Sequence, residues 1–287
     1  MRRAILLTLI FLSLGILDRR RIKNRLRRLA IAFSRLVLRQ ISPPYVLRPQ
    51  TAVVFAPHQD DETFGCGGLI ARKRNEGFPV HVVFITDGSA SHPGHSQFSP
   101  AAIAALRRRE ARAALAILGV ESGAIHFLDA PDGTLHQLNS TQRSDLIARI
   151  AELLRQLKPD EVFLPCCPDG SSEHDAAFSF IIEALHHSHL RPAVWQYPVW
   201  SWWNPLLLFR RIFSSHGRCQ APTEDYQLIK HRAVACYRSQ TEPLPPQSQA
   251  SLPRELVKMF NSDVEYFFRF NLSTGTPDLD PARPLLK

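Results

Sequence analysis

A short stretch near residue 60 combines one histidine with three consecutive acids. It reads PHQDDE and comes directly after the apolar run TAVVFA, residues 51–56. His58 and Asp61 are three residues apart, a spacing that lets both side chains point at one ion from a tight turn. Asp60 projects beside them. We therefore predict that His58 and Asp61 are metal ligands.

A third ligand must come from elsewhere in the chain, and His174 in SSEHDAAF is the candidate. Two imidazoles and one carboxylate suit zinc and leave room for water, a catalytic pattern and not a closed structural one. Zinc lowers the pKa of its water toward about 7, so the chemistry also needs a base. Asp60 is the candidate base. The alternative is that the acids only cap the following helix, which explains one acid and not His58.

The elements that position these residues follow from the hydrophobic pattern. Short apolar runs predict strands and alternate with helix-like stretches, which is typical of a parallel sheet covered on both faces. We expect an α/β fold, a single Rossmann-like domain with a mostly parallel sheet flanked by helices. The predicted strands are 51–56, 80–86, 125–128, 161–165 and 193–197, and the predicted helices lie near 66–76, 100–119, 140–157 and 174–188.

The polar clusters of the chain follow these strands. Ligand sites of such sheets lie beyond the carboxyl ends of the strands, so PHQDDE, TDGSASHPGH, DAPDG and PDGSSEHD are expected to share one rim. No GxGxxG motif opens the first helix, which disfavours a dinucleotide cofactor.

The positive charge is confined to the N-terminal segment. The formal net charge is +9, yet residues 1–50 hold twelve Lys and Arg and one acid, and the rest is slightly acidic. We therefore expect no nucleic-acid partner. Prolines near residue 45 mark a boundary, so the predicted parts are an apolar and basic helical segment 1–45, a catalytic domain 46–275 and a loose tail 276–287.

The N-terminal segment begins with an apolar run, residues 4–17, followed by arginines. The run is shorter than the roughly 20 residues that span a bilayer, and no small-residue cleavage site follows it. Anchoring on an anionic membrane surface, an uncleaved signal-anchor and a solvated basic helix all fit this pattern. Five cysteines without a metal-binding spacing indicate reduced thiols. The expected location is therefore the cytoplasm, peripheral to or anchored at the inner face of the membrane.

Two later segments are also distinctive. Residues 198–221 carry three tryptophans beside LLLF and two arginines, which fits either a bilayer interface or a buried insertion. The stretch SLPRELVKMFNSDVEYFFRF, residues 251–270, is predicted to form one helix that closes the domain.

Several of these motifs together resemble a known family. APHQDDETFGCGG resembles the AHPDDE signature of the LmbE/PIG-L-like N-acetylglucosaminyl deacetylases, zinc hydrolases that remove acetyl from N-acetylated sugar conjugates. The resemblance continues in VVFITDGSASHP, RRREARAALAILGV, FLDAPDG, EHDAA and KHRAVACYRSQ, over about residues 50–240. It implies zinc on His58, Asp61 and His174, with Asp60 as the general base.

The chain departs from the family pattern at one position. The family often has a histidine three residues before the third ligand, where it helps to stabilise the oxyanion, and this chain has Ser171 there. A serine donates only a weak neutral hydrogen bond, so zinc or another group must carry more of the charge. His92 and His95, in the loop after the second predicted strand, and a protonated Asp169 are candidate substitutes. Arg107, in an R-x-x-E element, is a candidate substrate ligand, with a solvated helix face as its alternative.

Three functions are consistent with these observations. The first is a zinc-dependent hydrolase that removes acetyl from an N-acetylated amino-sugar conjugate, lipid-linked or free, by metal-activated water with Asp60 as base. The second is a Mg²⁺-dependent phosphate-handling enzyme, against which two histidine ligands argue. The third is a membrane-associated homologue without catalytic activity, suggested by Ser171.

Overall fold

The computed structural model describes residues 22, 25–214 and 217–277. The apolar run 4–17 therefore lies outside the described residues. Of the predicted tail 276–287, the described part is Thr276–Pro277, which forms strand β8. The interpretations that rest on the remaining residues stay predictions.

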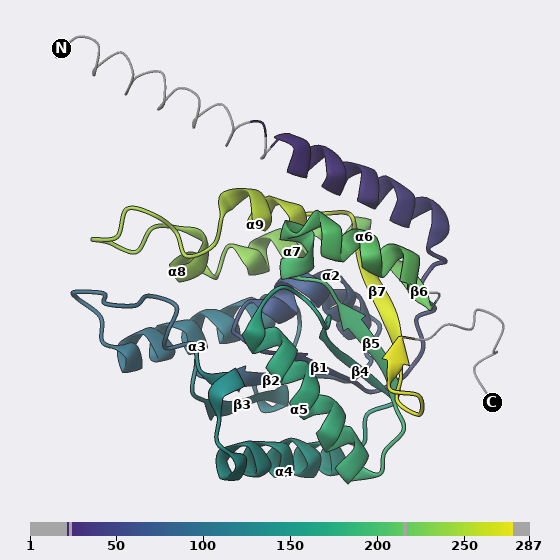
Figure 1. The fold of residues 1–287 in the computed structure, drawn as a ribbon, viewed down its shortest axis with the longest axis horizontal. Helices are drawn as coiled ribbons and strands as arrows, with labels where there is room; N and C mark the ends of the chain where they lie inside the picture. Colours follow the sequence, from purple (N-terminus) through teal and green to yellow (C-terminus); the bar gives the residue numbers. More distant parts are fainter. Residues whose placement is uncertain (1–21, 23–24, 215–216, 278–287) are drawn as a thin grey trace, which may run out of the picture.

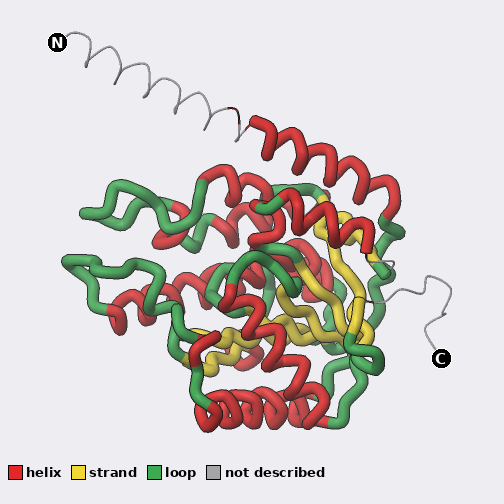
Figure 2. Tube along the Cα trace, viewed as in Figure 1, coloured by secondary structure: helices red, strands yellow, loops and turns green. Residues whose placement is uncertain are grey.

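One eight-stranded sheet runs through the centre of the molecule, in the order β3-β2-β1-β4-β5-β7-β6, with β8 paired to β7 (Figures 1 and 2). The first five strands of this order are parallel, and β7 pairs antiparallel with β5, β6 and β8. The bounds are β1 Ala52–Ala56, β2 Val80–Thr86, β3 Ile125–Ala130, β4 Glu161–Pro165, β5 Ala193–Tyr197, β6 Arg218–Pro222 and β7 Val264–Asn271. The predicted mostly parallel α/β sheet is confirmed.

Helices cover both faces of the sheet, as Figure 1 shows. On one face lie α4 and α5, and on the other lie α2, α7 and α9, with α6 and an N-terminal helix over residues 25–41 outside them. The bounds are α2 Asp61–Asn75, α3 Pro100–Ile117, α4 Ser140–Leu157, α5 Ser172–Ser188, α6 Pro205–Ser214, α7 Gln227–Val234, α8 Arg238–Thr241 and α9 Arg254–Phe260. The 3-10 turns that matter below are η2, Leu135–Gln137, and η3, Trp200–Trp203.

The alternation of side chains along β1 divides the core into two halves. Val53 and Phe55 pack with α4 and α5, whereas Val54 and Ala56 pack with α2 and α3. Because both faces are buried, the strand appears in the sequence as a continuous apolar run.

The C-terminal segment differs from its prediction. Residues 251–270 were expected to form one helix, but the structure has the short α9 followed by β7. The prediction is wrong because β7 lies between β5 and β6, so its first five residues are all buried and show no alternation. A continuous apolar run of this kind does not distinguish a buried strand from a helix.

Helix α2 packs closely on the end of β5. A Cβ atom on Gly65 would lie 2.2 Å from Cδ2 of Tyr197, whose hydroxyl donates to the carbonyl of Phe55 at 2.7 Å. Glycine lets the helix approach this ring, and the helix carries the PHQDDE acids at its first turn. The helix begins at Asp61 and not near residue 66 as predicted.

Within the described part of the chain, no helix has both the length and the apolar character needed to cross a bilayer.

Candidate metal centre and active site

His58, Asp61 and His174 meet at the carboxyl edge of the parallel sheet. His58 follows β1, Asp61 opens α2, and His174 lies in the first turn of α5, after β4. Nδ1 of His58 and Nε2 of His174 each lie 3.3 Å from Oδ2 of Asp61. One ligand atom from each residue lies within 4.8 Å of the others. The three predicted ligands therefore form a possible metal-binding site.

The donor atoms fit a metal ion. His174 is fully buried, yet its Nε2 is a buried atom without a hydrogen-bond partner. A buried polar atom of this kind costs free energy unless it finds a partner, and a cation between the three side chains would supply one. Two imidazole nitrogens and a carboxylate oxygen are ligands that zinc accepts in open sites.

In both ligand histidines, the ring nitrogen that does not face Asp61 is hydrogen-bonded to a carboxylate. Nε2 of His58 donates to Oδ1 of Asp132 at 3.2 Å, and Nδ1 of His174 donates to Oδ2 of Asp169 at 2.9 Å. Such partners hold the ring orientation and the tautomer that leave the first nitrogen free for a metal. The two histidines are thus both oriented toward Asp61.

Asp169 is fully buried behind His174. Its carboxylate also accepts hydrogen bonds from the backbone N–H groups of Val199, Trp200 and Ser201. The sequence suggested Asp169 as an oxyanion or substrate group. Because its oxygens are already bonded and it does not line the cavity, this geometry favours the orienting of His174 instead.

Asp60 lies beside the three ligands and is paired with Arg107 of α3. Nη2 of Arg107 is 3.4 Å from Oδ2 of Asp60 and donates to the carbonyl of Gln59 at 3.0 Å. The side chain of Asp60 makes no capping hydrogen bond to α2, so it is not used as a helix cap. Arg107 is 3% exposed, which rules out the alternative of a solvated face.

The electrostatic setting separates the two neighbouring acids. Burial raises the pKa of Asp60 to about 8, although the charge of Arg107 opposes this, and repulsion from Asp61 adds to it. Burial would also raise the pKa of Asp61, but His174 and His58 hold it well below its usual value. A cation held by the ligands would lower the pKa of Asp60 as well. Asp61 is therefore suited to bind an ion, and Asp60 to exchange a proton near neutral pH.

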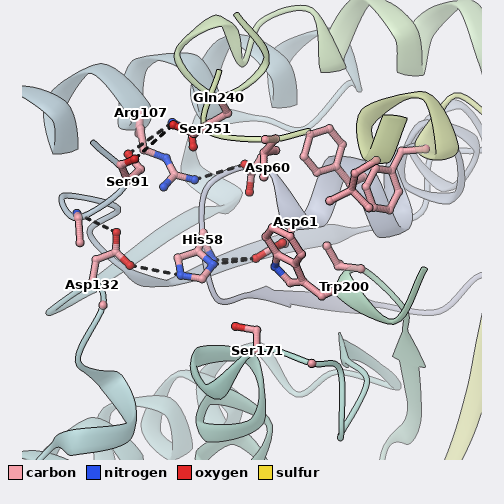
Figure 3. Close-up of a pocket in the computed structure, with 18 of the residues that line it drawn as sticks. His58, Asp60, Asp61, Ser91, Arg107, Asp132, Ser171, Trp200, Gln240 and Ser251 are labelled. Carbon is pink, nitrogen blue, oxygen red and sulfur yellow. Dashed lines mark hydrogen bonds and ion pairs between the residues drawn. The ribbon is translucent and has the colours of Figure 1, made fainter. Parts of the chain in front are cut away.

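The groups that the sequence suggested in place of the missing histidine are now located. Ser171 caps α5, where its Oγ accepts from the backbone N–H of His174 at 3.5 Å, and it lines the cavity (Figure 3). His92 is buried behind Ser91 and Ser251, whose hydroxyls lie 3.0 and 3.1 Å from its two ring nitrogens. Of Ser171 and His92, therefore, Ser171 is the residue that faces the cavity.

A second group of ligand types borders the first. Glu173 accepts from Nδ1 of His136 at 3.0 Å and from the backbone N–H of Leu135 at 2.9 Å. With His58 and Asp132, Glu173 forms another possible metal-binding group. Because it shares His58 with the first group, it extends the same centre.

His58, Asp61 and Asp132 line a cavity of about 520 Å³ (Figure 3). Its volume lies within the usual range for small-molecule sites. One side is polar, with the ligands His58 and Asp61 and with Asp60, Arg107 and Ser171. The other side is apolar and is formed by Phe64, Val199, Trp200, Leu252, Leu256 and Phe260.

Part of this cavity could not be found from the sequence. Gln240 follows α7 and Ser251 lies before α9, more than 140 residues after Ser91, yet the three are joined by hydrogen bonds. The motif KHRAVACYRSQ ends at Gln240 and was the one sequence feature that indicated this part of the cavity wall. Glu110 holds the wall in place, since it accepts from the backbone N–H of Ser239 at 2.8 Å.

Comparison with known proteins gives a family match. Residues 53–185 match the family described as PIG-L, GlcNAc-PI de-N-acetylase. Over 140 residues the chain is 29% identical to 4-oxalmesaconate hydratase of Pseudomonas putida KT2440. The matched region covers 47% of this chain and 51% of that protein. The chain thus spans about half the length of that curated relative.

Two solved structures have a similar fold. One is GalB, the 4-carboxy-2-hydroxymuconate hydratase of Pseudomonas putida KT2440, with a TM-score of 0.60 and 17% identity over 83% of this chain and 100% of that chain. The other is N,N'-diacetylchitobiose deacetylase of Pyrococcus horikoshii, with a TM-score of 0.57 and 21% identity over 82% of this chain and 88% of that chain. At these identities the likeness concerns the fold.

Proposed function

Because the chain carries a PIG-L family domain over residues 53–185, we propose that it is a zinc-dependent hydrolase that removes the acetyl group from an N-acetylated amino-sugar conjugate. The observation that carries this proposal is the convergence of His58, Asp61 and His174 beside a buried acid, Asp60, that does not belong to the ligand set. The family description and the deacetylase among the similar folds support the substrate class.

Nδ1 of His58, the carboxylate of Asp61 and Nε2 of His174 would hold the zinc. A zinc ion bound there supplies Lewis acidity that polarises an acyl carbonyl and makes water more acidic. Asp132 and Asp169 keep the two imidazoles in the orientation that the ligand set requires.

The protein's own acid performs the proton transfers. Asp60 takes the proton of the attacking water and returns it to the nitrogen of the leaving amino sugar. Arg107 holds the carboxylate of Asp60 at 3.4 Å and favours its charged form before attack. Ser171 faces the cavity and donates a hydrogen bond toward the developing negative charge. Trp200 offers an apolar surface for the sugar ring.

The test combines metal analysis with acetate release. We expect about one zinc per chain, lost in His58→Ala and His174→Ala, and acetate release from N-acetylglucosaminyl conjugates. Asp60→Asn should keep the zinc and lose the activity. Zinc-free protein with full phosphatase activity in magnesium would instead support the phosphate-handling alternative. A zinc-loaded protein that neither releases acetate nor hydrates 4-oxalmesaconate would support the non-catalytic one.

A hydratase is the second candidate, favoured by the 29% identity to 4-oxalmesaconate hydratase. In that reaction the same base would activate water for addition to a carbon–carbon double bond, so no amine would leave. The two functions are separated by their products. Loss of ultraviolet absorbance from 4-oxalmesaconate, without acetate release from any amino-sugar conjugate, would favour the hydratase.

A further inference from the structure

Two helices carry large apolar side chains that the domain does not cover. They are the helix over residues 25–41 and α6. Seven such side chains are between 48% and 67% exposed, and we call them the outer apolar face: Leu26, Leu29, Phe33, Leu36, Leu206, Phe209 and Phe213. Contiguous exposed apolar surface of this extent is unusual on a soluble protein and marks an interaction site.

The spacing on the N-terminal helix shows that the exposure is systematic. Leu26, Leu29, Phe33 and Leu36 recur at helical intervals and form one stripe. Ile31 and Leu38 point the other way and are buried in the core. A helix that packed on its own domain alone would carry polar residues on its outer side. This helix carries large apolar residues on its outer side as well, so a second apolar surface is expected to cover them.

Helix α6 repeats the same arrangement. Leu208 and Ile212 are buried, whereas Leu206, Phe209 and Phe213 point outward. The rings of Phe209 and Phe213 are in contact, with centroids 4.4 Å apart. Exposed aromatic and leucine side chains of this kind are typical of helices that lie in a membrane interface.

The two helices border one cavity next to the active site. This second cavity has a volume of about 590 Å³, and both Leu26 and Leu206 line it. Arg27 stacks over Trp203, with its guanidinium carbon 4.4 Å from the ring centroid, and fixes the helix beside η3. Gly170 and Trp200 line both this cavity and the candidate active-site cavity. The outer apolar face is therefore continuous with the active-site wall.

Charge identifies the surface that would cover this face. The stretch 19–59 contains no Asp or Glu, and the helix carries five arginines. Arg25 and Arg28 are exposed beside the apolar stripe. Residues 1–21 come before this helix in the chain, and their sequence adds the apolar run 4–17 and five further arginines. Apolar side chains flanked by arginines complement an anionic lipid surface.

We propose that the outer apolar face docks on an anionic lipid bilayer and holds the mouth of the active-site cavity at the membrane. This inference concerns where the protein works and does not depend on the reaction that it catalyses. The rival occupant of the face is a second copy of the chain, and it predicts a dimer in solution that the face variants dissociate.

The experiment measures sedimentation of the full chain with phosphatidylcholine vesicles, with and without phosphatidylglycerol. One variant combines Leu29→Glu with Phe33→Glu, and a second combines Leu206→Glu with Phe213→Glu. The matched control is Leu228→Glu, because Leu228 is 78% exposed but lies on α7, outside the outer apolar face. Circular dichroism and zinc content show whether each variant is folded.

We expect the parent chain to bind the anionic vesicles more tightly than the neutral ones. Each double variant should weaken that binding by about tenfold or more, and the control should not change it. Unchanged binding in both double variants would overturn the proposal, since residues 1–21 alone would then hold the membrane. A dimer in vesicle-free solution that both variants dissociate would also overturn it and assign the face to a second copy.

Discussion

Asp132 and Asp169 illustrate how much of the candidate site depends on residues that do not bind the metal. Each accepts a hydrogen bond from a ligand histidine, at 3.2 and 2.9 Å. Without that bond, the imidazole loses its preferred tautomer and orientation, and its free nitrogen is less well placed toward Asp61. The two acids differ in their other partners, because Asp169 accepts from three backbone N–H groups and Asp132 from that of Ala90.

Asp132→Asn should therefore weaken zinc binding without unfolding the protein. We expect a loss of affinity of about 10- to 100-fold, measured by competition with a chromophoric chelator. Asp145→Asn, on α4 at a distance from the site, is the control and should bind zinc like the parent. Equal zinc affinity in Asp132→Asn and the parent would show that this contact does not orient His58.

Arg107 acts on the base and not on the metal, so its substitution should have a different signature. Arg107→Met removes the charge next to Asp60 and the hydrogen bond to the Gln59 carbonyl. We expect kcat to fall about 10- to 100-fold with zinc content unchanged. Arg109→Met, on the exposed side of the same helix, is the matched control. A rise in KM with kcat unchanged would instead assign Arg107 to substrate binding.

At the scale of elements, the position of the site depends on how closely α2 approaches β5. The helix carries Asp61 at its first residue, and Gly65 lies one turn later against the ring of Tyr197. A second restraint is the buried ion pair between Lys230 of α7 and Glu265 of β7, 2.7 Å apart. Glu265 also accepts from the backbone N–H of Gly68 at 2.7 Å, so the pair ties α2 to α7 and to strand β7.

Gly65→Ala should displace α2 and destabilise the fold. The added Cβ would lie 2.2 Å from the ring of Tyr197, so the helix or the ring must move. We expect a loss of about 1–3 kcal/mol in the free energy of unfolding, measured by urea denaturation. The control is Gly123→Ala, where no atom lies within 4 Å of the new Cβ. Equal stability of the two variants would show that Tyr197 moves aside at no cost.

At the scale of the whole molecule, the candidate metal centre joins parts of the fold that are distant in sequence. His58 and Asp61 follow β1, whereas His174 comes more than 110 residues later, after β4. A metal that binds all three is bound by the folded state and only weakly by the unfolded chain. Metal binding and global stability are therefore linked.

Zinc should raise the thermal stability of the protein. At a free zinc concentration about 100 times its Kd, linkage gives about 2.7 kcal/mol, which appears as a higher Tm in scanning calorimetry. A chelator should reverse the shift, and His58→Ala should show none. An equal rise of Tm in that variant would place the stabilising metal elsewhere in the chain.

The sequence by itself determined the five parallel strands and the rim that carries the polar clusters. Local patterns suffice for this, because a strand buried on both faces is a short apolar run and the ligand edge follows from the direction of the strands. The sequence also placed His58, Asp61 and His174 on that rim, where the structure brings them together.

The tertiary structure alone decided which partner each polar side chain faces. It turned Arg107 inward to Asp60, placed Asp169 behind His174 and brought Gln240 and Ser251 to the cavity wall. It also made a strand of residues 264–271, where an apolar run fits a helix equally well. These features depend on contacts between residues far apart in the chain, and local periodicity carries no information about such contacts.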